Sequence, residues 1–395
     1  MNKTETMAEK IIQWSNINTG TFNILGLERL AKVLVEEFSI LGGEGDILSL
    51  PPIEQIDSLG EIEKKDIGPL LRFWKRPNAP LQVLLVAHMD TVYGLEHAFQ
   101  KATKKNAERV CGPGVTDMKG GICVMLEALK AFEKTPNANK LGWEVLITPD
   151  EEIGSLASGP YLAERAKFHQ VGLVFEPAMD EQGTLASERK GSGHFTIVLH
   201  GRAAHAGRAF HEGKNAIVAL SDVIKEIAAL NGQHEGVTLN VGFVHGGGPV
   251  NVVPDFALCR LDVRLQKIED EQWVQEQLES IIGQYQQREG YRVTLKGGIH
   301  RKPKFLTGKT KELYELVKKI GEELGQTITW TPSGGCCDGN NLAALGLPNV
   351  DSLGVCGGKI HSEEEYMLVN SLVPRVELTT AILTRLSENA STGIT

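Results

Sequence analysis

Four short segments of the chain combine imidazole and carboxylate side chains of the kinds that bind metal ions. They are His88-Met89-Asp90, the glycine-containing stretch 114–121 around Asp117, Asp150-Glu151-Glu152 and Glu176-Pro177. Imidazole with carboxylates and without thiolates suits zinc, with cobalt or manganese as possible substitutes. A histidine from the first segment and one carboxylate from each of the other three segments are more ligands than a one-metal catalytic zinc site uses. They suit two metal ions about 3.5–4 Å apart that share a bridging carboxylate.

Such a two-metal site still needs one more ligand, and a histidine late in the chain is the candidate. The segment is Ile360-His361-Ser362-Glu363-Glu364-Glu365. Each feature has an ordinary interpretation as well. A lone histidine usually lies on the surface or in the core, paired glutamates usually face solvent, and Asp117 could simply cap the helix that follows it. The combination of all the segments favours a cation site with His361 as its fifth ligand.

The elements that must position these residues read as an open α/β sheet. Short apolar runs without strict alternation, rich in β-branched residues, predict strands buried on both faces at 82–87, 143–148 and 171–175. Apolar residues at helical spacing predict a helix over 119–134. Sites in such sheets form at the carboxyl ends of the strands, which is where three of the four segments fall. We therefore expect them to converge on one edge of the sheet.

The pattern changes near residue 190. The order of predicted elements becomes β-α-β-β-α-β, the ferredoxin-like arrangement, with strands at 193–200, 237–244, 255–264 and 291–296 and helices at 213–231 and 270–287. Longer helices return at 309–324 and 371–386. We therefore expect a domain formed by residues 1–189 and 301–395, into which residues 190–300 are inserted.

Composition excludes several classes of protein. The chain has 395 residues, 41 Lys and Arg against 50 Asp and Glu, and a net charge of −9. Without a concentrated cationic patch it is a poor nucleic-acid binder. No apolar run approaches the roughly 18 residues that a membrane helix needs, and the first residues do not resemble a secretory signal. Six cysteines without a CxxC pair favour thiols in a reducing compartment. We expect a cytoplasmic protein.

The motifs together resemble the di-zinc aminoacylase/carboxypeptidase family, which includes acetylornithine deacetylase, succinyl-diaminopimelate desuccinylase and glutamate carboxypeptidase. The motifs are AHMDTV around His88, GPGVTDMKGG around Asp117, PDEEIGS around Glu151, FEPA at Glu176 and HSEEEY at His361. They occur in the family's order and spacing over nearly the whole chain. FEPA, the 13-residue separation of Asn251 from Arg264, and HSxxEY are closest to the glutamate carboxypeptidase branch.

The resemblance implies a zinc-peptidase-like fold with a mostly parallel sheet and flanking helices, and a role for each residue of the cluster. His88 and Glu176 would bind one zinc ion, Glu152 and His361 would bind the other, and Asp117 would bridge both. Asp90 would orient His88, as metal-bound histidines generally require. Glu151 would be the general base. The peptide bond after Asp117 would be cis.

The resemblance also assigns roles outside the cluster. The segment Gly201–Gly207 is similar to the family's lid motif, in which a histidine, here His205, stabilises the oxyanion in the partner subunit's active site. The inserted domain would then be a lid and dimerisation domain. Asn251 and Arg264 would contact the substrate's carboxylate, which arginine can bind through two parallel hydrogen bonds.

Near the substrate carboxylate the chain departs from the family. The usual Gly-Gly-Gly-Ser/Thr-Asp-Ala stretch reads Gly334-Gly335-Cys336-Cys337-Asp338 here. Gly335 stays a candidate for substrate binding, but Cys336 replaces a glycine whose lack of a side chain lets backbone approach ligand. A metal-ligand role for the two thiols is a further possibility.

The resemblance implies a hydrolase, a metallopeptidase of the carboxypeptidase type. With two zinc ions it would release a C-terminal, acidic, glutamate-like amino acid from an acyl or peptidyl substrate. An N-acyl-amino-acid deacylase, such as acetylornithine deacetylase or an aminoacylase, would use the same chemistry. An inactive, metal-poor dimer that binds amino-acid derivatives is the alternative from another class, and the presence of all five ligands and the base argues against it. Beyond a small-molecule substrate, we expect a homodimer through the lid domain.

Overall fold

The computed structural model describes residues 3–390, and over this range the chain divides into two compact units. The first unit comprises residues up to 53, 65–189 and 304 onward, and the second unit comprises residues 54–64 and 190–303. The segment 54–64 belongs to a hairpin of β2 (Ile53–Ile56) and β3 (Ile62–Lys65). The sequence did not indicate that this early segment joins the second unit.

The first unit is built on a six-stranded sheet that is mostly parallel, as the sequence predicts. In sheet order the strands are β1 (Glu44–Leu48), β4 (Leu70–Lys75), β8 (Leu141–Thr148), β5 (Leu81–His88), β9 (Val171–Val174) and β18 (Asn349–Val350). β8, β5, β9 and β18 pair in parallel, whereas β4 is antiparallel to both of its neighbours. The three strands expected from apolar runs are thus β5, β8 and β9, side by side at the centre.

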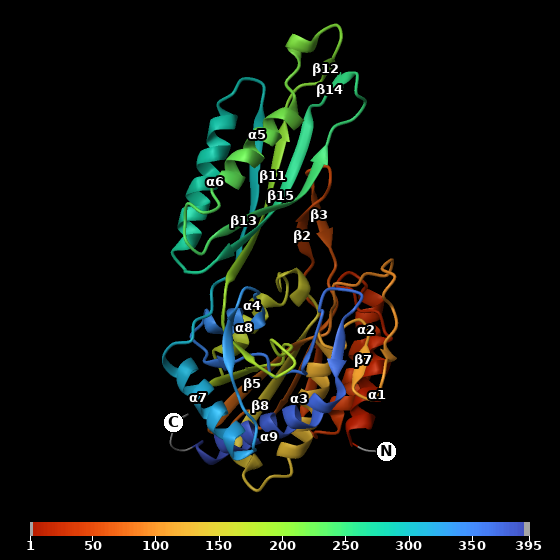
Figure 1. Cartoon of the computed structure of the whole chain (residues 1–395), viewed down its shortest axis with the longest axis vertical. Helices are drawn as coiled ribbons and strands as arrows, with labels where there is room; N and C mark the ends of the chain where they lie inside the picture. The colour runs from red at the N-terminus through yellow and green to blue at the C-terminus, as the bar shows by residue number, and fades with distance from the viewer. Residues whose placement is uncertain (1–2, 391–395) are drawn as a thin grey trace. The chain divides into compact units, whose positions relative to one another are not determined.

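Helices cover both faces of this sheet. Successive side chains of a strand point to opposite faces, so each central strand contributes to two hydrophobic cores. In β5, Val83 and Leu85 face one core and Leu84 and Val86 face another. Helices that contribute to the first core are α1 (Lys3–Ser15), α2 (Ile24–Ser39), α3 (Lys119–Phe132), α7 (Gly308–Glu323) and α9 (Leu372–Glu388). The second core contains residues of α4 (Gly159–Ala166) and α8 (Asp338–Ala343) (Figure 1). Burial on both faces explains why these strands read as continuous apolar runs.

A small sheet in the first unit joins two segments that are far apart in the chain. Its strands, in order, are β19 (Gly357–Gly358), β20 (Tyr366–Leu368), β7 (Arg109–Cys111) and β6 (Thr103–Lys104). Tyr366 pairs with Cys111, and Leu368 pairs with Arg109. This pairing places the segment before β20, which contains His361, beside the loop after β7, which contains Asp117.

The second unit has the β-α-β-β-α-β order that the sequence predicts. Its main elements are β11 (Gly191–His200), α5 (Ala216–Ala229), β13 (Thr238–Gly246), β15 (Phe256–Leu265), α6 (Asp270–Gln286) and β16 (Arg292–Arg301). The strands form one antiparallel sheet in the order β13-β15-β11-β16. α5 and α6 contact each other and cover one face of it (Figure 1). A two-stranded ladder of β12 (Ala204–His205) and β14 (Val252–Val253) completes the unit.

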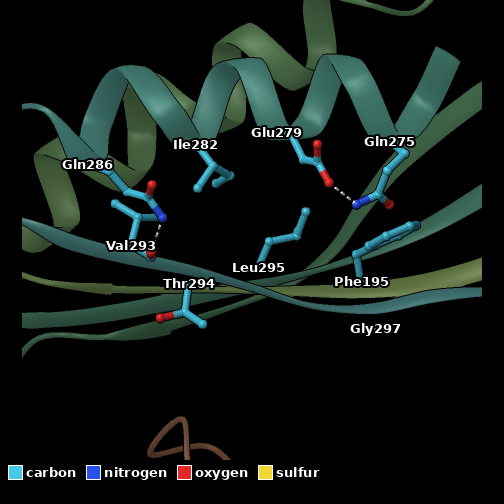
Figure 2. A pocket seen from close by; sticks show the side chains of 9 residues that line it. All are labelled: Phe195, Gln275, Glu279, Ile282, Gln286, Val293, Thr294, Leu295 and Gly297. Atoms are coloured by element: carbon cyan, nitrogen blue, oxygen red, sulfur yellow. Dashed lines mark hydrogen bonds between the residues drawn. The ribbon is translucent and has the colours of Figure 1, made fainter. Parts of the chain in front are cut away.

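A pocket of about 430 Å³ lies between α6 and the edge strand β16. Figure 2 shows Leu295 and Phe195 pointing toward the helix, with Ile282 facing them and Thr294 pointing away. Gln286 closes one end through a 3.0 Å hydrogen bond from its Nε2 to the carbonyl oxygen of Val293.

The lengths and apolar character of the helices and the state of the cysteines also follow from the structure. Among residues 3–390, no helix combines the length and the apolar character that crossing a bilayer requires. All six cysteines lie in the described part of the chain, and none of them forms a disulfide bond.

Candidate metal centre

The three central strands bring their polar ends together at one edge of the sheet. His88 is the last residue of β5. Glu151 begins a short 3-10 helix, η2 (Glu151–Ile153), shortly after the end of β8, and Glu176 follows the end of β9 by two residues. Because β8, β5 and β9 are adjacent and parallel, their carboxyl ends are neighbours. His88, Glu151 and Glu176 offer ligand atoms that all lie within 4.8 Å of one another, and all three residues are buried.

Asp117 lies between two histidines and presents one carboxylate oxygen to each. His88 Nε2 is 3.1 Å from Asp117 Oδ1, and His361 Nε2 is 3.4 Å from Asp117 Oδ2. A second carboxylate lies near the same Nε2 atom of each histidine. Glu176 Oε1 is 3.8 Å from His88 Nε2, and Glu152 Oε2 is 3.3 Å from His361 Nε2. The structure thus brings all five predicted ligands together, with Asp117 near both histidines, and His88, Asp117 and Glu152 also offer ligand atoms within 4.8 Å of one another.

Asp117 does not cap the helix that follows it. The residue that caps α3 is Met118, which makes no side-chain hydrogen bond there, and the Asp117 carboxylate points to the two histidines instead. The peptide bond between Asp117 and Met118 is cis, as the resemblance predicts. The alternative role of Asp117 as a helix cap is therefore wrong.

Asp90 connects the two sides of the cluster. Its Oδ1 lies 3.3 Å from His88 Nδ1, which leaves Nε2 of the same ring facing Asp117. The carboxylate also accepts hydrogen bonds from the backbone N–H groups of Glu151 and Glu152, both at 3.2 Å, and from Thr21 Oγ1 at 2.7 Å. Asp90 is completely buried. These contacts are the ones expected of a residue that orients the ring of His88 and positions both glutamates through their backbone.

The carboxylates of the cluster repel one another. Burial, and next the charge of Glu151, raises the pKa of Glu176 well above its usual value. Burial and the charge of Asp117 raise the pKa of Glu152 to about 8. Such shifts mean that the charged forms of these groups lack enough positive charge nearby. A bound cation would supply it.

The pKa values of the two histidines are correspondingly raised. Hydrogen bonds with Asp117 and Glu152 raise the pKa of His361 to about 11. Burial alone would lower the pKa of His88, but its contacts with Asp117 and Asp90 raise it well above the usual value. Metal ions bind neutral imidazole and ionised carboxylate, and so displace such protons. Both the donor types and their charge balance fit a pair of divalent cations.

Three predicted residues lie in the second unit. His205 is exposed on β12, and its Nδ1 accepts a 3.1 Å hydrogen bond from the backbone N–H of Gly207. Asn251 is next to it, because its carbonyl oxygen accepts a hydrogen bond from Ala206 N at 2.9 Å. Arg264 is on β15, and its Nε donates to Asp262 Oδ2 at 2.9 Å. The lid motif and Asn251 thus form one surface feature, whereas Arg264 already holds a carboxylate of its own unit.

The loop before α8 places its two cysteines differently from each other. Gly335 is exposed, and its backbone N–H is 3.2 Å from Ser333 Oγ. Cys336 is half-buried. Cys337 is fully buried, caps α8 and donates its thiol to Asp351 Oδ2 at 3.1 Å. Among the described residues, no group of close metal-binding side chains includes a cysteine. The structure therefore gives no support to a metal-ligand role for these thiols.

Sequence reasoning missed two buried groups near the cluster. Arg189, at the end of β10 (Leu185–Arg189), donates from Nε to Asp351 Oδ2 at 2.5 Å. Glu365, in the HSEEEY motif, is 1% exposed and accepts hydrogen bonds from the backbone of the Asp117 loop. Burial of a charged residue requires compensating partners. A run of three glutamates gave no signal as to which one would be buried.

A mostly parallel α/β sheet with paired histidine and carboxylate groups at its carboxyl edge is the arrangement of a metal-dependent hydrolase. The comparison with known families agrees with this class and narrows it. Residues 84–385 match Peptidase family M20/M25/M40, and the chain belongs to this family.

Known relatives cover most of the chain. It is 29% identical to carboxypeptidase G2 of Pseudomonas sp. (strain RS-16) over 93% of this chain and 85% of that protein. It is 27% identical to succinyl-diaminopimelate desuccinylase of Hahella chejuensis over 81% of this chain and 86% of that protein. Among solved structures, an M20 family metallo-carboxypeptidase from Sulfolobus solfataricus has the same fold, with a TM-score of 0.76 at 17% identity over 98% of this chain and all of that chain.

Proposed function

We propose that the protein is a two-metal amidohydrolase that releases a C-terminal, acidic amino acid from an acyl or peptidyl substrate. The observation that carries the proposal is Asp117, whose two carboxylate oxygens face His88 and His361 separately. His88 and Glu176 would hold one ion, Glu152 and His361 the other, and Asp117 both. Zinc is the metal that this donor set suits best, and cobalt or manganese could replace it.

When bound, two such ions would polarise the amide carbonyl and lower the pKa of a water molecule. Glu151 is the group of this chain that would accept the proton as that water attacks and then deliver it to the leaving nitrogen. Its position supports this role, because its carboxylate is buried beside His88 and Glu176 and its backbone is held by Asp90. His205 would stabilise the negative charge that develops on the carbonyl oxygen.

The preference for an acidic residue rests on the resemblance to the glutamate carboxypeptidase branch, whereas similarity to a protein named as a carboxypeptidase supports the release of a C-terminal residue. Arg264 and Asn251 would contact the carboxylate of the released amino acid. A deacylase of N-acyl amino acids is the second candidate, which the similarity to a desuccinylase favours. A reducing compartment such as the cytoplasm is part of the proposal, because none of the six cysteines is in a disulfide bond.

We also propose a homodimer through the second unit. β13 is an edge strand of its sheet, and Val244 on it and Ile217 and Val218 on α5 are 56%, 44% and 57% exposed. An apolar edge strand next to an apolar helix surface is a ready template for pairing with another copy. His205 of each chain would then serve the metal centre of its partner.

A panel of substrates with one common acyl group tests the proposed specificity. We expect kcat/KM for N-acyl-L-glutamate to exceed that for N-acyl-L-ornithine and N-acyl-L-leucine about tenfold or more, since a hydrogen bond to a charged group contributes about 1.5–3 kcal/mol. The matched control is N-acyl-L-glutamate with its α-carboxyl group amidated, which should be a poor substrate for a carboxypeptidase. Faster hydrolysis of the ornithine derivative would instead identify a deacylase of basic substrates.

A further inference from the structure

Glu365 is a buried carboxylate that takes no part in the proposed chemistry. Its Oε1 accepts hydrogen bonds from the backbone N–H groups of Thr116, at 2.9 Å, and Asp117, at 3.1 Å. Its Oε2 accepts from the backbone N–H of Gly114 at 3.2 Å and from Tyr93 Oη at 3.0 Å. Four donors thus converge on one carboxylate, two on each oxygen.

These contacts join three segments that contain candidate metal ligands. Glu365 follows His361 by four residues, and the backbone groups that it binds form the loop that ends in Asp117. Tyr93 follows His88 by five residues, and its hydroxyl is also 2.9 Å from the carbonyl oxygen of Ser362. The segments of His88, Asp117 and His361 therefore meet at one buried carboxylate.

The backbone at His361 needs such support. His361 has φ of 60°, in the left-handed region, where a residue with a side chain is disfavoured. Its side chain is 53% exposed, so little packing holds the ring in place. The turn that follows is held by the 3.1 Å hydrogen bond from Glu365 N to the carbonyl oxygen of Ser362 and by the hydroxyl of Tyr93. Glu365 and Tyr93 thus hold the turn that contains His361, whose ring is not held by packing in the protein core.

We infer that Glu365 is a positioning residue for the metal centre, which holds the Asp117 loop and the His361 turn at the spacing that two metal ions require. It acts through backbone groups and Tyr93 and is not itself a ligand. The inference rests on the proposed function, because it assigns the purpose of this contact to metal binding. A carboxylate is suited to the task because it only accepts hydrogen bonds, and it faces three backbone N–H groups and the Tyr93 hydroxyl, whose one proton it shares with the carbonyl oxygen of Ser362.

The test is the metal affinity of Glu365→Gln. The glutamine amide has nearly the same shape as the carboxylate. Its NH₂ group cannot accept hydrogen bonds, so the two donors that faced one of the carboxylate oxygens lose their acceptor. We expect the dissociation constant for zinc or cobalt, measured by competition with a chromophoric chelator, to rise about 10–100-fold, the scale for groups that support metal ligands. Excess metal should restore part of the activity. Glu365→Asp, which keeps a carboxylate with shorter reach, should lie between Gln and wild type.

Glu364→Gln is the matched control. Glu364 is in the same run of glutamates, its side chain is 77% exposed, and its 3.8 Å ion pair with Lys359 is on the surface. It should bind metal as wild type does. Tyr93→Phe removes one of the four donors and should weaken binding less than Glu365→Gln. If Glu365→Gln does not fold, the metal affinity of Tyr93→Phe is measured in its place. Wild-type metal affinity in the variant that folds would overturn the inference.

Amide hydrogen exchange of the metal-free protein separates this inference from the proposed function. In metal-free Glu365→Gln or Tyr93→Phe, faster exchange confined to residues 112–117 and 359–366 supports the positioning role. Unchanged exchange there contradicts it. If the wild-type protein binds no metal at all, the proposed function fails, and the exchange result alone decides whether Glu365 holds these two segments. General destabilisation would instead speed exchange throughout the first unit.

Discussion

Glu151→Gln should lower kcat at least about 10²-fold, the usual contribution of a general base, while the content of bound metal stays at the wild-type level. Glutamine keeps the shape of the side chain and cannot accept a proton from water. Glu151 is 7% exposed, and its backbone N–H is held by Asp90 at 3.2 Å, so the substitution should leave the local structure unchanged. Steady-state kinetics together with elemental analysis of the same sample measure both halves of this prediction.

Glu152→Gln is the matched control for Glu151→Gln. The two glutamates are adjacent, but the Glu152 carboxylate faces His361 at 3.3 Å, whereas that of Glu151 lies with His88 and Glu176. The Glu152 variant should therefore lose metal as well as activity. Near-normal turnover of Glu151→Gln would exclude Glu151 as the base. Loss of one metal equivalent in that variant would show that Glu151 is a metal ligand. Its position beside His88 and Glu176 would also allow that role.

Mixing two inactive variants should restore activity if His205 acts across a dimer interface. Glu151→Gln subunits have an intact His205, and His205→Ala subunits have an intact Glu151. A mixed dimer contains one complete site, built from the base of one chain and the histidine of the other. In a symmetric dimer of two equivalent sites, we therefore expect up to about half of wild-type activity per mixed dimer. Activity measured before and after subunit exchange, with exchange followed by mass spectrometry, gives the result.

The control for this experiment is a mixture of Glu151→Gln with Glu152→Gln. Each change inactivates the site of its own chain, Glu151→Gln by removing the base and Glu152→Gln by removing a metal ligand, so no dimer formed from them contains a complete site. This mixture should stay inactive. If exchange is demonstrated and the His205→Ala mixture also stays inactive, His205 does not act in the partner's site. A fully active monomer in sedimentation would contradict the shared site as well.

Much of the fold follows from local patterns in the chain. The strands that became β5, β8 and β9 were predictable because burial on both faces leaves a continuous apolar run. Their polar ends had to become neighbours, because adjacent parallel strands end at one edge of the sheet. This is why His88, Glu151 and Glu176 were predicted to converge and why they lie together. Their roles in metal binding and catalysis stay predictions.

Other features depend on contacts that no local pattern reports. The hairpin of β2 and β3 is short and polar, and its place in the second unit depends on tertiary contacts, such as the 2.8 Å hydrogen bond from Arg260 to the carbonyl oxygen of Ile56. Cys336 and Cys337 are adjacent in the sequence, but the thiol of Cys337, at the start of α8, donates to Asp351 Oδ2. Glu365 is the buried member of the glutamate run, and its carboxylate is held by tertiary hydrogen bonds from the Asp117 loop.

The central claim is that one chain holds two divalent metal ions and needs them for hydrolysis. Elemental analysis of the purified protein, before and after dialysis against a chelator, tests it most directly. We predict two equivalents of zinc, cobalt or manganese per chain, loss of both metal and activity on chelation, and return of both when zinc or cobalt is added. Protein that contains no transition metal, and that stays inactive on every substrate of the panel after zinc or cobalt is added, would contradict the account.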